Sequence, residues 1–200
     1  MRLSRVISII LHPILMPIIT FYLTLELVPN IHFSINNYLT YTFLILFVCT
    51  VMLPLISVLF LMKNNLVSSL DMKNYKERPT PLLITGLWMC YGYYNLKNIL
   101  FFSPVLNAAL ICMIFIVFTS FIISKYWKIS LHMLGVGGMT GLFFSLNLLF
   151  GNLLPITTLC VLLSGVLGVA RINENAHSHT QIYVGFLLGF FIEAFGVLLL

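Results

Sequence analysis

Seven long apolar segments follow one another along the chain, with short polar stretches between them. Each is close to the roughly 20 residues that a helix needs to cross the hydrocarbon core of a bilayer. We therefore predict an all-α, polytopic transmembrane helical bundle of about seven spans (six to seven). The predicted spans are residues 5–28, 38–62, 80–98, 101–124, 131–150, 153–170 and 181–200.

Prolines and glycines modify three of these spans. Pro13 and Pro17 predict a kink in the first span, and Pro54 predicts another in the second, because proline interrupts helix hydrogen bonding. Gly137 and Gly141 lie four residues apart in the fifth span. This spacing predicts a G-x-x-x-G face for close packing against another helix.

The composition agrees with a membrane protein. Hydrophobic residues make up 60% of the chain and charged residues 8%, with a mean hydropathy of +1.08, which is too apolar for a soluble core of 200 residues. No polar run is long enough for a second globule, so we predict a single integral membrane domain, 1–200. The start, Met1–Arg5 followed by an apolar run, resembles a signal peptide, but no small-x-small cleavage site follows, and we expect an uncleaved first span.

Charge and cysteine content exclude two classes of function. The net charge of +5 lies in short connecting segments, and no basic stripe with interleaved aromatic residues is present, so nucleic acid is not an expected partner. The four cysteines lie inside apolar runs without C-x-x-C spacing. We expect them to be small buried hydrophobic residues and not a disulfide or zinc framework.

Residues 170–181 form a polar stretch between two long apolar segments. His177 and Gln181 are four residues apart, so on a helix they share one face. Arg171 is near enough in sequence for its side chain to reach the same anionic group as His177. A guanidinium beside a neutral imidazole is what phosphoryl transfer to a histidine nucleophile requires.

Two other polar clusters fall on the same side of the predicted bundle. With seven spans, the loops after the second, fourth and sixth spans lie on one membrane face, and they hold Arg78, His132 and residues 170–181. The connections on the opposite face are almost without charge apart from Lys97. Three separate clusters can therefore meet in one composite site.

These residues resemble the type 2 phosphatidic acid phosphatases, which are membrane members of the histidine acid phosphatase and haloperoxidase superfamily. The first motif of that family is a lysine, six residues and then Arg-Pro. Arg78 and Pro79 match the end of this motif. Asp71 occupies the lysine position, and Lys73 or Lys76 would have to replace it.

The other two family motifs are also partly kept. The second is Pro-Ser-Gly-His, of which Ser130 and His132 remain. The third is Ser-Arg, five residues, His, three residues, Asp. Arg171 and His177 match it at the correct spacing, while Gln181 replaces the aspartate.

The resemblance covers about residues 70–189 and implies a metal-independent phosphoric monoester or lipid pyrophosphate hydrolase that needs no cofactor. It implies that His177 attacks phosphorus, that His132 protonates the leaving oxygen, and that Gln181 orients the nucleophile. The residues that it implies for binding the phosphate oxygens are Arg78, Arg171, Lys73 and Ser130. The implied partners are membrane lipids and a lipid phosphate or pyrophosphate: a phosphatidate, a polyprenyl pyrophosphate or a phosphorylated glycolipid.

The lost aspartate leaves alternatives open. Gln181 accepts a hydrogen bond but carries no charge, and the comparable loss in a serine protease triad lowers turnover about ten-thousandfold. Glu174, three residues before His177, is a second candidate for the missing carboxylate. A zinc site made from His132, His177 and His179 is a weaker alternative, because no fourth ligand has the usual spacing.

Two other functions compete with hydrolysis. The departures from the motifs favour a non-enzymatic membrane protein of the same fold that binds or moves anionic lipid headgroups. Glu193 and His12, inside predicted spans, suggest a proton-coupled transporter.

The resemblance implies an integral protein of the bacterial inner membrane, and the oligomeric state stays open. Arg2 and Arg5 favour a cytoplasmic face for the motif side by the positive-inside rule. The sites of the family that the chain resembles commonly face the periplasm or lumen instead.

Overall fold

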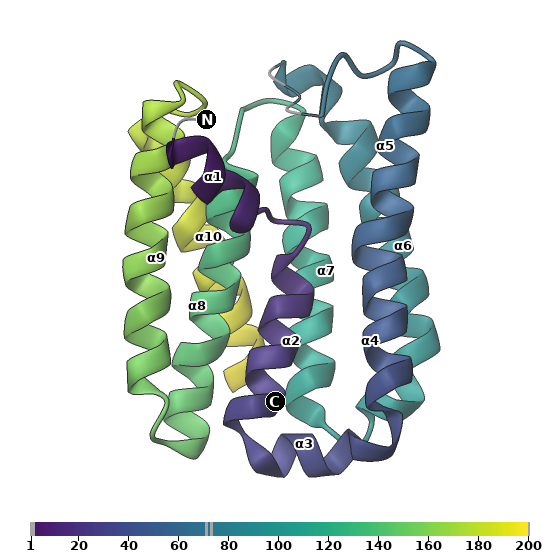
Figure 1. Ribbon diagram of the computed structural model, residues 1–200, viewed down its shortest axis with the longest axis vertical. Helices are drawn as coiled ribbons and strands as arrows, with labels where there is room; N and C mark the ends of the chain where they lie inside the picture. The colour runs from purple at the N-terminus through teal and green to yellow at the C-terminus, as the bar shows by residue number, and fades with distance from the viewer. Residues whose placement is uncertain (1–2, 71, 73, 200) are drawn as a thin grey trace.

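The chain is a bundle of helices that run lengthwise side by side, as Figure 1 shows. The computed structural model describes residues 3–70, 72 and 74–199. Within these residues the regular structure is helical and no β-strand occurs, so the prediction of an all-α fold is confirmed.

Five helical stretches are long and apolar enough to cross a membrane among the residues that the structure describes. They are Pro29–Lys63, α7 (Pro104–Ser124), α8 (Leu131–Phe150), α9 (Leu154–Asn173) and α10 (His179–Leu198). The chain therefore has the architecture of an integral membrane protein. The first and third predicted spans correspond to α2 (Met16–Leu27), which has only 12 residues, and α6 (Pro79–Leu100), a less apolar helix of 22 residues.

The first predicted span is broken rather than merely kinked. Helix α1 (Leu3–Ile10) ends before Pro13, and α2 begins at Met16. In the break, the backbone N–H of Ile14 donates to Nδ1 of His12 at 3.3 Å. Proline lacks the N–H that a continuous helix would use here, so α1 takes its own direction and packs beside α9 (Figure 1).

Residues 29–37, which separate the first two predicted spans and would form a turn there, are helical. Helix α3 (Pro29–Ile35) begins with a proline, which is favourable in a first helical turn because its missing N–H would have no partner there. A short 3₁₀ helix η1 (Asn36–Tyr38) connects it to α4 (Leu39–Phe47).

The kink predicted at Pro54 is a short π-helix, η2 (Val48–Met52), followed by α5 (Leu53–Lys63). Pro54 has no N–H to donate to the carbonyl four residues before it. The wider π turn accommodates this loss without ending the helix.

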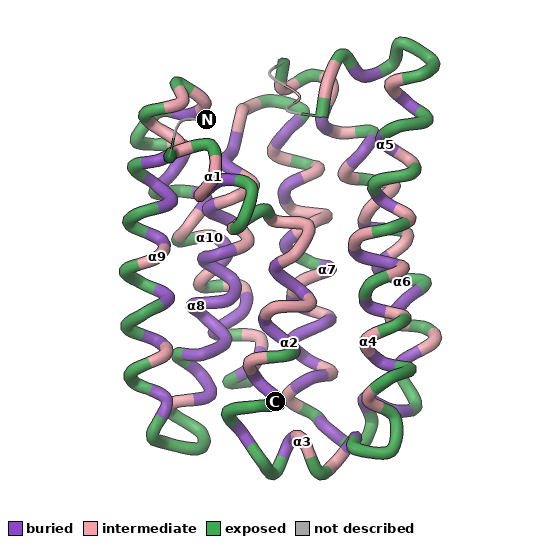
Figure 2. Tube along the Cα trace, in the orientation of Figure 1, coloured by how far each residue is buried: buried purple, intermediate pink, exposed green. Residues whose placement is uncertain are grey.

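Helices α8 and α10 pack closely through glycines. A Cβ atom added at Gly137 would collide with the backbone carbonyl of Phe186, and one added at Gly141 would collide with that of Phe190. The predicted glycine face is thus confirmed, and its partner is α10. Figure 2 shows that α8 is the most continuously buried helix of the bundle.

All four cysteines are free, and three of them are buried as predicted. Cys90 is an exception: it lies on the exposed side of α6, so the prediction of burial is wrong for this residue.

Candidate functional site

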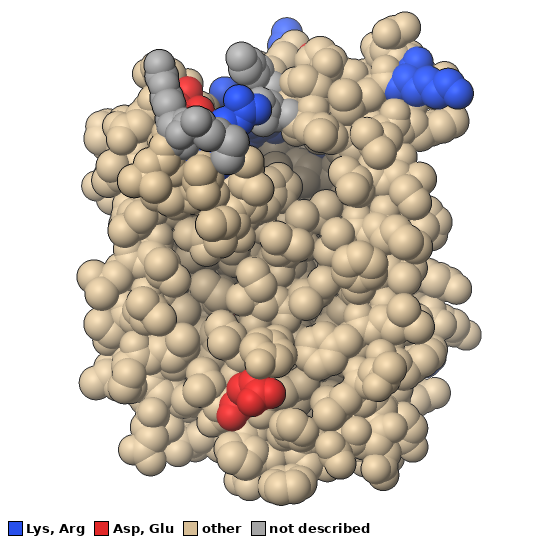
Figure 3. Space-filling view, viewed as in Figure 1, with Lys and Arg blue, Asp and Glu red and all other residues tan. Residues whose placement is uncertain are grey.

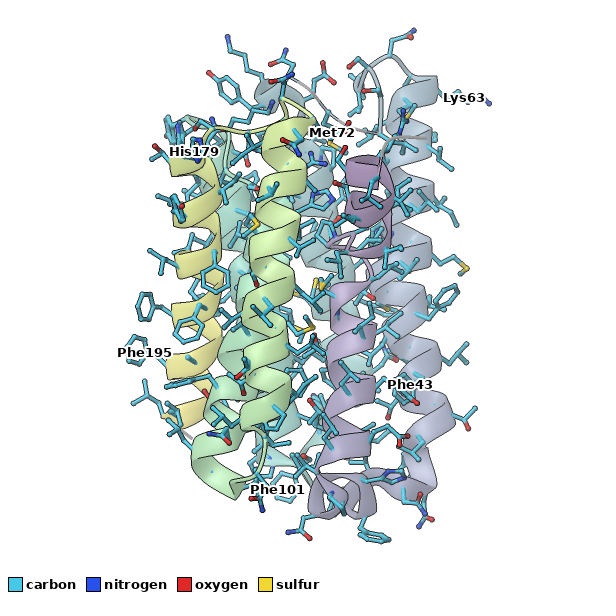
Figure 4. The ribbon with its side chains drawn as sticks, turned by 60° about the vertical axis from the view of Figure 1, so that its left-hand side comes forward. Phe43, Lys63, Met72, Phe101, His179 and Phe195 are labelled. Carbon is cyan, nitrogen blue, oxygen red and sulfur yellow. The ribbon has the colours of Figure 1, made fainter. Side chains whose placement is uncertain are left out.

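The three polar clusters lie at the same end of the bundle, where α5, α7 and α9 end and α6, α8 and α10 begin (Figure 1). Most of the basic side chains visible in Figure 3 gather at this end. Figure 4 places Met72 and His179 there together with Lys63, and Phe101 at the opposite end. The structure thereby brings together Arg78, His132, Arg171 and His177.

Arg78 links the first cluster to the second. It follows the 3₁₀ helix η3 (Tyr75–Glu77) and is only 5% exposed. Its Nε donates to the carbonyl of Met72 at 3.1 Å, and its Nη1 donates to the carbonyl of Ile129 at 2.9 Å. These two carbonyls fix the plane of the guanidinium group. Burial, and secondly the charge of Arg171, lower the pKa of Arg78 to about 10, so it remains a cation at neutral pH.

His177 is held in one tautomer. Its Nδ1 lies 3.0 Å from Oε1 of Gln181, and the backbone N–H of Ser178 donates to the same Oε1 at 3.1 Å. Since that atom is an acceptor, Nδ1 of His177 must carry the proton. The other nitrogen, Nε2, then has the lone pair that a nucleophile needs.

His177 is also neutral in this environment. Its side chain is only 9% exposed, and burial lowers its pKa to about 4. The hydrogen bond to Gln181 opposes this effect, while the charges of Arg78, Arg171 and Lys128 add to it. These interactions join the third cluster to the other two. Lys128 was not predicted as a site residue.

Gln181 has a second role that the sequence could have revealed. Ser178 and Gln181 form a capping box at the start of α10, in which the N–H of Gln181 donates to Oγ of Ser178 at 3.4 Å. Ser-x-x-Gln before an apolar run is the signature of this motif. The same amide therefore starts the helix and orients the imidazole of His177.

His132, the second residue of α8, contacts the N-terminal segment. Its Nε2 lies 3.0 Å from the carbonyl of Ser8 in α1, and its ring packs edge-on against that of His12, with centroids 5.2 Å apart. A carbonyl only accepts, so Nε2 carries a proton. His132 also interacts electrostatically with Arg171 and His177. Nothing in the sequence indicates the contact with Ser8.

The remaining phosphate-binding candidates differ in what the structure shows. Ser130 is completely buried immediately before α8, and within the described part of the chain its hydroxyl has no hydrogen-bond partner. Arg171 lies half-buried in the last turn of α9. Lys73 and Asp71 fall outside the described residues.

Two alternatives from the sequence do not match the observed contacts. The carboxylate of Glu174 accepts a hydrogen bond from the hydroxyl of Ser4, while Nδ1 of His177 bonds to Gln181 instead. His179 is exposed, and the described residues contain no group of three His, Cys, Asp or Glu side chains that could hold a metal ion.

Glu193 lies far from this site. It is completely buried in α10, and neither of its carboxylate oxygens has a hydrogen-bond partner among the described residues. Gly138 of α8 is its neighbour, and a Cβ at that glycine would lie 3.9 Å from Oε2. Fourteen helical residues separate Glu193 from the start of α10 at His179, a distance of about 21 Å.

No protein-family model, curated protein or solved structure matches the chain. The structure itself defines an all-helical protein with five membrane-compatible helices and a site in which a neutral imidazole adjoins several cations at one end. Chemically, such a site can bind an anion, and its lone-pair nitrogen can attack an electrophilic centre.

Proposed function

We propose that the chain is a membrane lipid phosphatase-like hydrolase, related to the type 2 phosphatidic acid phosphatases, that cleaves a phosphomonoester or pyrophosphate through a phosphohistidine. One observation carries the proposal. His177 donates from Nδ1 to Gln181, keeps a lone pair on Nε2, and lies within electrostatic range of Arg78 and Arg171.

The first step would form a bond between Nε2 of His177 and phosphorus while the bond from phosphorus to the lipid oxygen breaks. Arg78, Arg171 and Lys73 would compensate the negative charge on the phosphoryl oxygens, and the Ser130 hydroxyl would donate to one of them. Gln181 would hold the imidazolium that forms by accepting its Nδ1 proton.

His132, entering the step as an imidazolium, would supply its Nε2 proton to the leaving lipid oxygen and become a neutral imidazole. The proton on its Nε2 is now donated to Ser8, so this bond must be exchanged for one to the leaving oxygen. In the second step a water molecule would attack phosphorus, the bond to nitrogen would break, and His132 would take a proton from the water. The products are inorganic phosphate and the lipid alcohol from a phosphomonoester, or inorganic phosphate and the lipid monophosphate from a pyrophosphate.

A non-enzymatic lipid-binding protein is the second candidate. Two observations favour it. The neutral Gln181 stands in place of a carboxylate, and the carbonyl of Ser8 accepts the hydrogen bond from Nε2 of His132. Such a protein would use the same cations to bind an anionic headgroup without turnover.

The proposal includes a location and a topology. The chain would be a single domain of the bacterial inner membrane with seven spans. Helices α2 and α6 would supply the two spans beyond the five long apolar stretches. Because the spans number seven, the α5–α6, α7–α8 and α9–α10 connections would share one membrane face.

Phosphate release and trapping of the phosphoenzyme test this function. Purified protein in detergent micelles is incubated with phosphatidate or a polyprenyl pyrophosphate carrying ³²P in the scissile group. We expect release of phosphate and acid-labile labelling of the protein, both abolished in His177→Ala. His179→Ala is the matched control, because this exposed histidine lies two residues further along and should keep both signals.

Two results would contradict hydrolysis at this site. Phosphate release that persists in both His177→Ala and His132→Ala would place the chemistry elsewhere. Tight binding of phosphatidate without release or labelling would favour the second candidate.

A further inference from the structure

A cavity of about 310 Å³ lies beside the cationic site. It is lined by the α1–α2 connection, α2, η2, α5, the α5–α6 connection, α6, α7 and α8. Figure 3 shows that the face toward the viewer is hollowed below the basic end of the bundle, between the α1–α2 connection and α5 as Figure 1 labels them. The volume is at the lower end of the range for small-ligand pockets.

The lining of this cavity is mostly apolar. Three of its four hydroxyls donate to carbonyls of their own helices: Thr50 to Leu46 at 2.7 Å, Thr85 to Pro81 at 2.8 Å and Ser120 to Val117 at 2.7 Å. The fourth, that of Thr20, has no hydrogen-bond partner among the described residues. A buried water needs two to four polar partners, and the single hydroxyl of Thr20 does not supply that number. The cavity therefore suits a hydrocarbon better than water or a polar ligand.

One end of the cavity adjoins the proposed site. His12 lines the cavity and packs against the ring of His132. Met72 also lines it, and its carbonyl accepts the hydrogen bond from Arg78. A ligand with a polar head at the cations could thus extend an apolar tail directly into the cavity.

The other end is marked by methionines from three helices. Along α6 the lining runs from Pro81 to Met89, and along α8 from Leu131 to Met139. Eight residues of helix correspond to a depth of about 12 Å. Met113 of α7 lies at a similar depth below Ser120. Methionine side chains are flexible and polarisable, and they adapt to apolar ligands of different shape.

The π-helix η2 contributes directly to this wall, because Thr50 and Val51 lie within it and line the cavity. Single π turns inside α-helices occur frequently at functional sites, because the extra residue redirects side chains. The irregular turn thus widens the helix where the cavity is deepest.

We infer that this cavity binds a single hydrocarbon chain of the lipid whose phosphate occupies the cationic site, and that Met89, Met113 and Met139 limit the chain length. The inference rests on the proposed function. The chain would enter from the bilayer through the hollowed face between the α1–α2 connection and α5.

Filling the deep end tests the inference. Lysophosphatidates with acyl chains from hexanoyl to stearoyl are compared as substrates of the full protein and of Met89→Trp. We expect kcat/KM of Met89→Trp to fall at least tenfold for stearoyl lysophosphatidate. For hexanoyl lysophosphatidate, kcat/KM should stay unchanged. Leu87→Trp is the matched control, because this residue lies two positions away on α6 and is 56% exposed.

A second pair of variants distinguishes loss of the chain site from misfolding of Met89→Trp. Met113→Trp fills the cavity from α7, and Phe115→Trp, at a 62% exposed position of the same helix, is its control. Unchanged chain-length preference in both filled variants, with hydrolysis intact, would refute the cavity as the chain site while leaving the hydrolase function standing.

If the unmodified protein shows no hydrolysis, a binding measurement tests the chain site separately from the proposed hydrolase function. A lysophosphatidate with a photoreactive group at its chain end is crosslinked to the His177→Ala variant, and the adducts are mapped by mass spectrometry. Adducts at Met89, Met113 or Met139 without any turnover by the unmodified protein would support the chain site and refute hydrolysis. Adducts confined to lipid-exposed positions would refute the chain site.

Discussion

Replacing Gln181 by glutamate should raise the pKa of His177 and accelerate its phosphorylation. The two side chains have the same length, so a carboxylate oxygen can accept the same bonds, from Nδ1 at 3.0 Å and from Ser178 at 3.1 Å. Opposite charges about 4 Å apart interact by about 4 kcal/mol at an effective dielectric constant of 20. One pH unit corresponds to about 1.4 kcal/mol, so the pKa should move from about 4 to about 7.

The sign of the effect on rate follows from the two forms of the imidazole. Free His177 with a pKa of about 4 is neutral and competent above that pH, so the acid limb of kcat/KM should lie near pH 4. In Gln181→Glu the acid limb of kcat/KM should move to about pH 7. Above that pH, phosphorylation of His177 should be faster, because the carboxylate stabilises the developing imidazolium. The comparable charge in a serine protease triad changes turnover about ten-thousandfold, and we expect at least a tenfold gain here.

The assay combines a titration with a rate profile. Long-range ¹H–¹⁵N correlation spectra of the imidazoles report the protonation of His177 without substrate, and phosphate release measured from about two pH units below the acid limb up to pH 9 gives kcat/KM. Thr180→Glu is the control, because it adds the same charge at an exposed position one residue away. A titration midpoint of His177 that is the same in Gln181→Glu and the original protein would refute the role given to Gln181.

Three further predictions concern stability, each measured by thermal unfolding in detergent. Arg78→Lys should lower the free energy of unfolding by about 2 kcal/mol, because a lysine ammonium cannot replace a guanidinium group that donates to two carbonyls. The same substitution should weaken the binding of vanadate. An unchanged Tm would contradict the structural role of Arg78. Gly137→Ala should lower the free energy of unfolding by about 1–3 kcal/mol, because the added Cβ pushes α10 away. Gly165→Ala is the control: its Cβ meets nothing within 4 Å, so it should be neutral or stabilising. Equal effects of the two substitutions would refute close packing of α8 on α10 at Gly137. Glu193→Leu should raise stability by about 1–3 kcal/mol, since it removes carboxylate oxygens without partners among the described residues, and a lower Tm would show that the carboxylate makes a stabilising interaction.

The apolar pattern predicted the limits of a helix correctly where residues that start or end helices flank it. The fifth predicted span and α8 have the same limits, 131–150, because Ser130 precedes the helix and Gly151 ends it with a φ of +72°. The sixth span was predicted to end at 170, but α9 continues to Asn173, because its last turn is polar and hydropathy does not detect it. The helix α3 was missed for a related reason, since its proline and asparagine resemble a turn.

The candidate site was predictable as far as side chains define it. The order of the spans placed Arg78, His132 and His177 at one end, and the structure brings these residues into electrostatic contact with Arg171. The partners of Arg78 and His132 were not predictable, because they are backbone carbonyls, which leave no mark in a sequence. The cavity beside the site was missed for a different reason: it is formed by residues from eight helices and connections whose relative positions no local pattern gives.

The glycine contact between α8 and α10 has an electrostatic consequence for the whole basic end. These two helices run in the same direction, so their N-termini, at Leu131 and His179, both point to the basic end, and α10 begins further out because Gly185 lies against the carbonyl of Ser130. Each N-terminus carries about half a positive charge from the aligned peptide dipoles. Parallel neighbours add these charges, whereas antiparallel neighbours would cancel them. A variant lacking both Arg78 and Arg171 should therefore still attract anions, with an affinity that weakens but does not vanish.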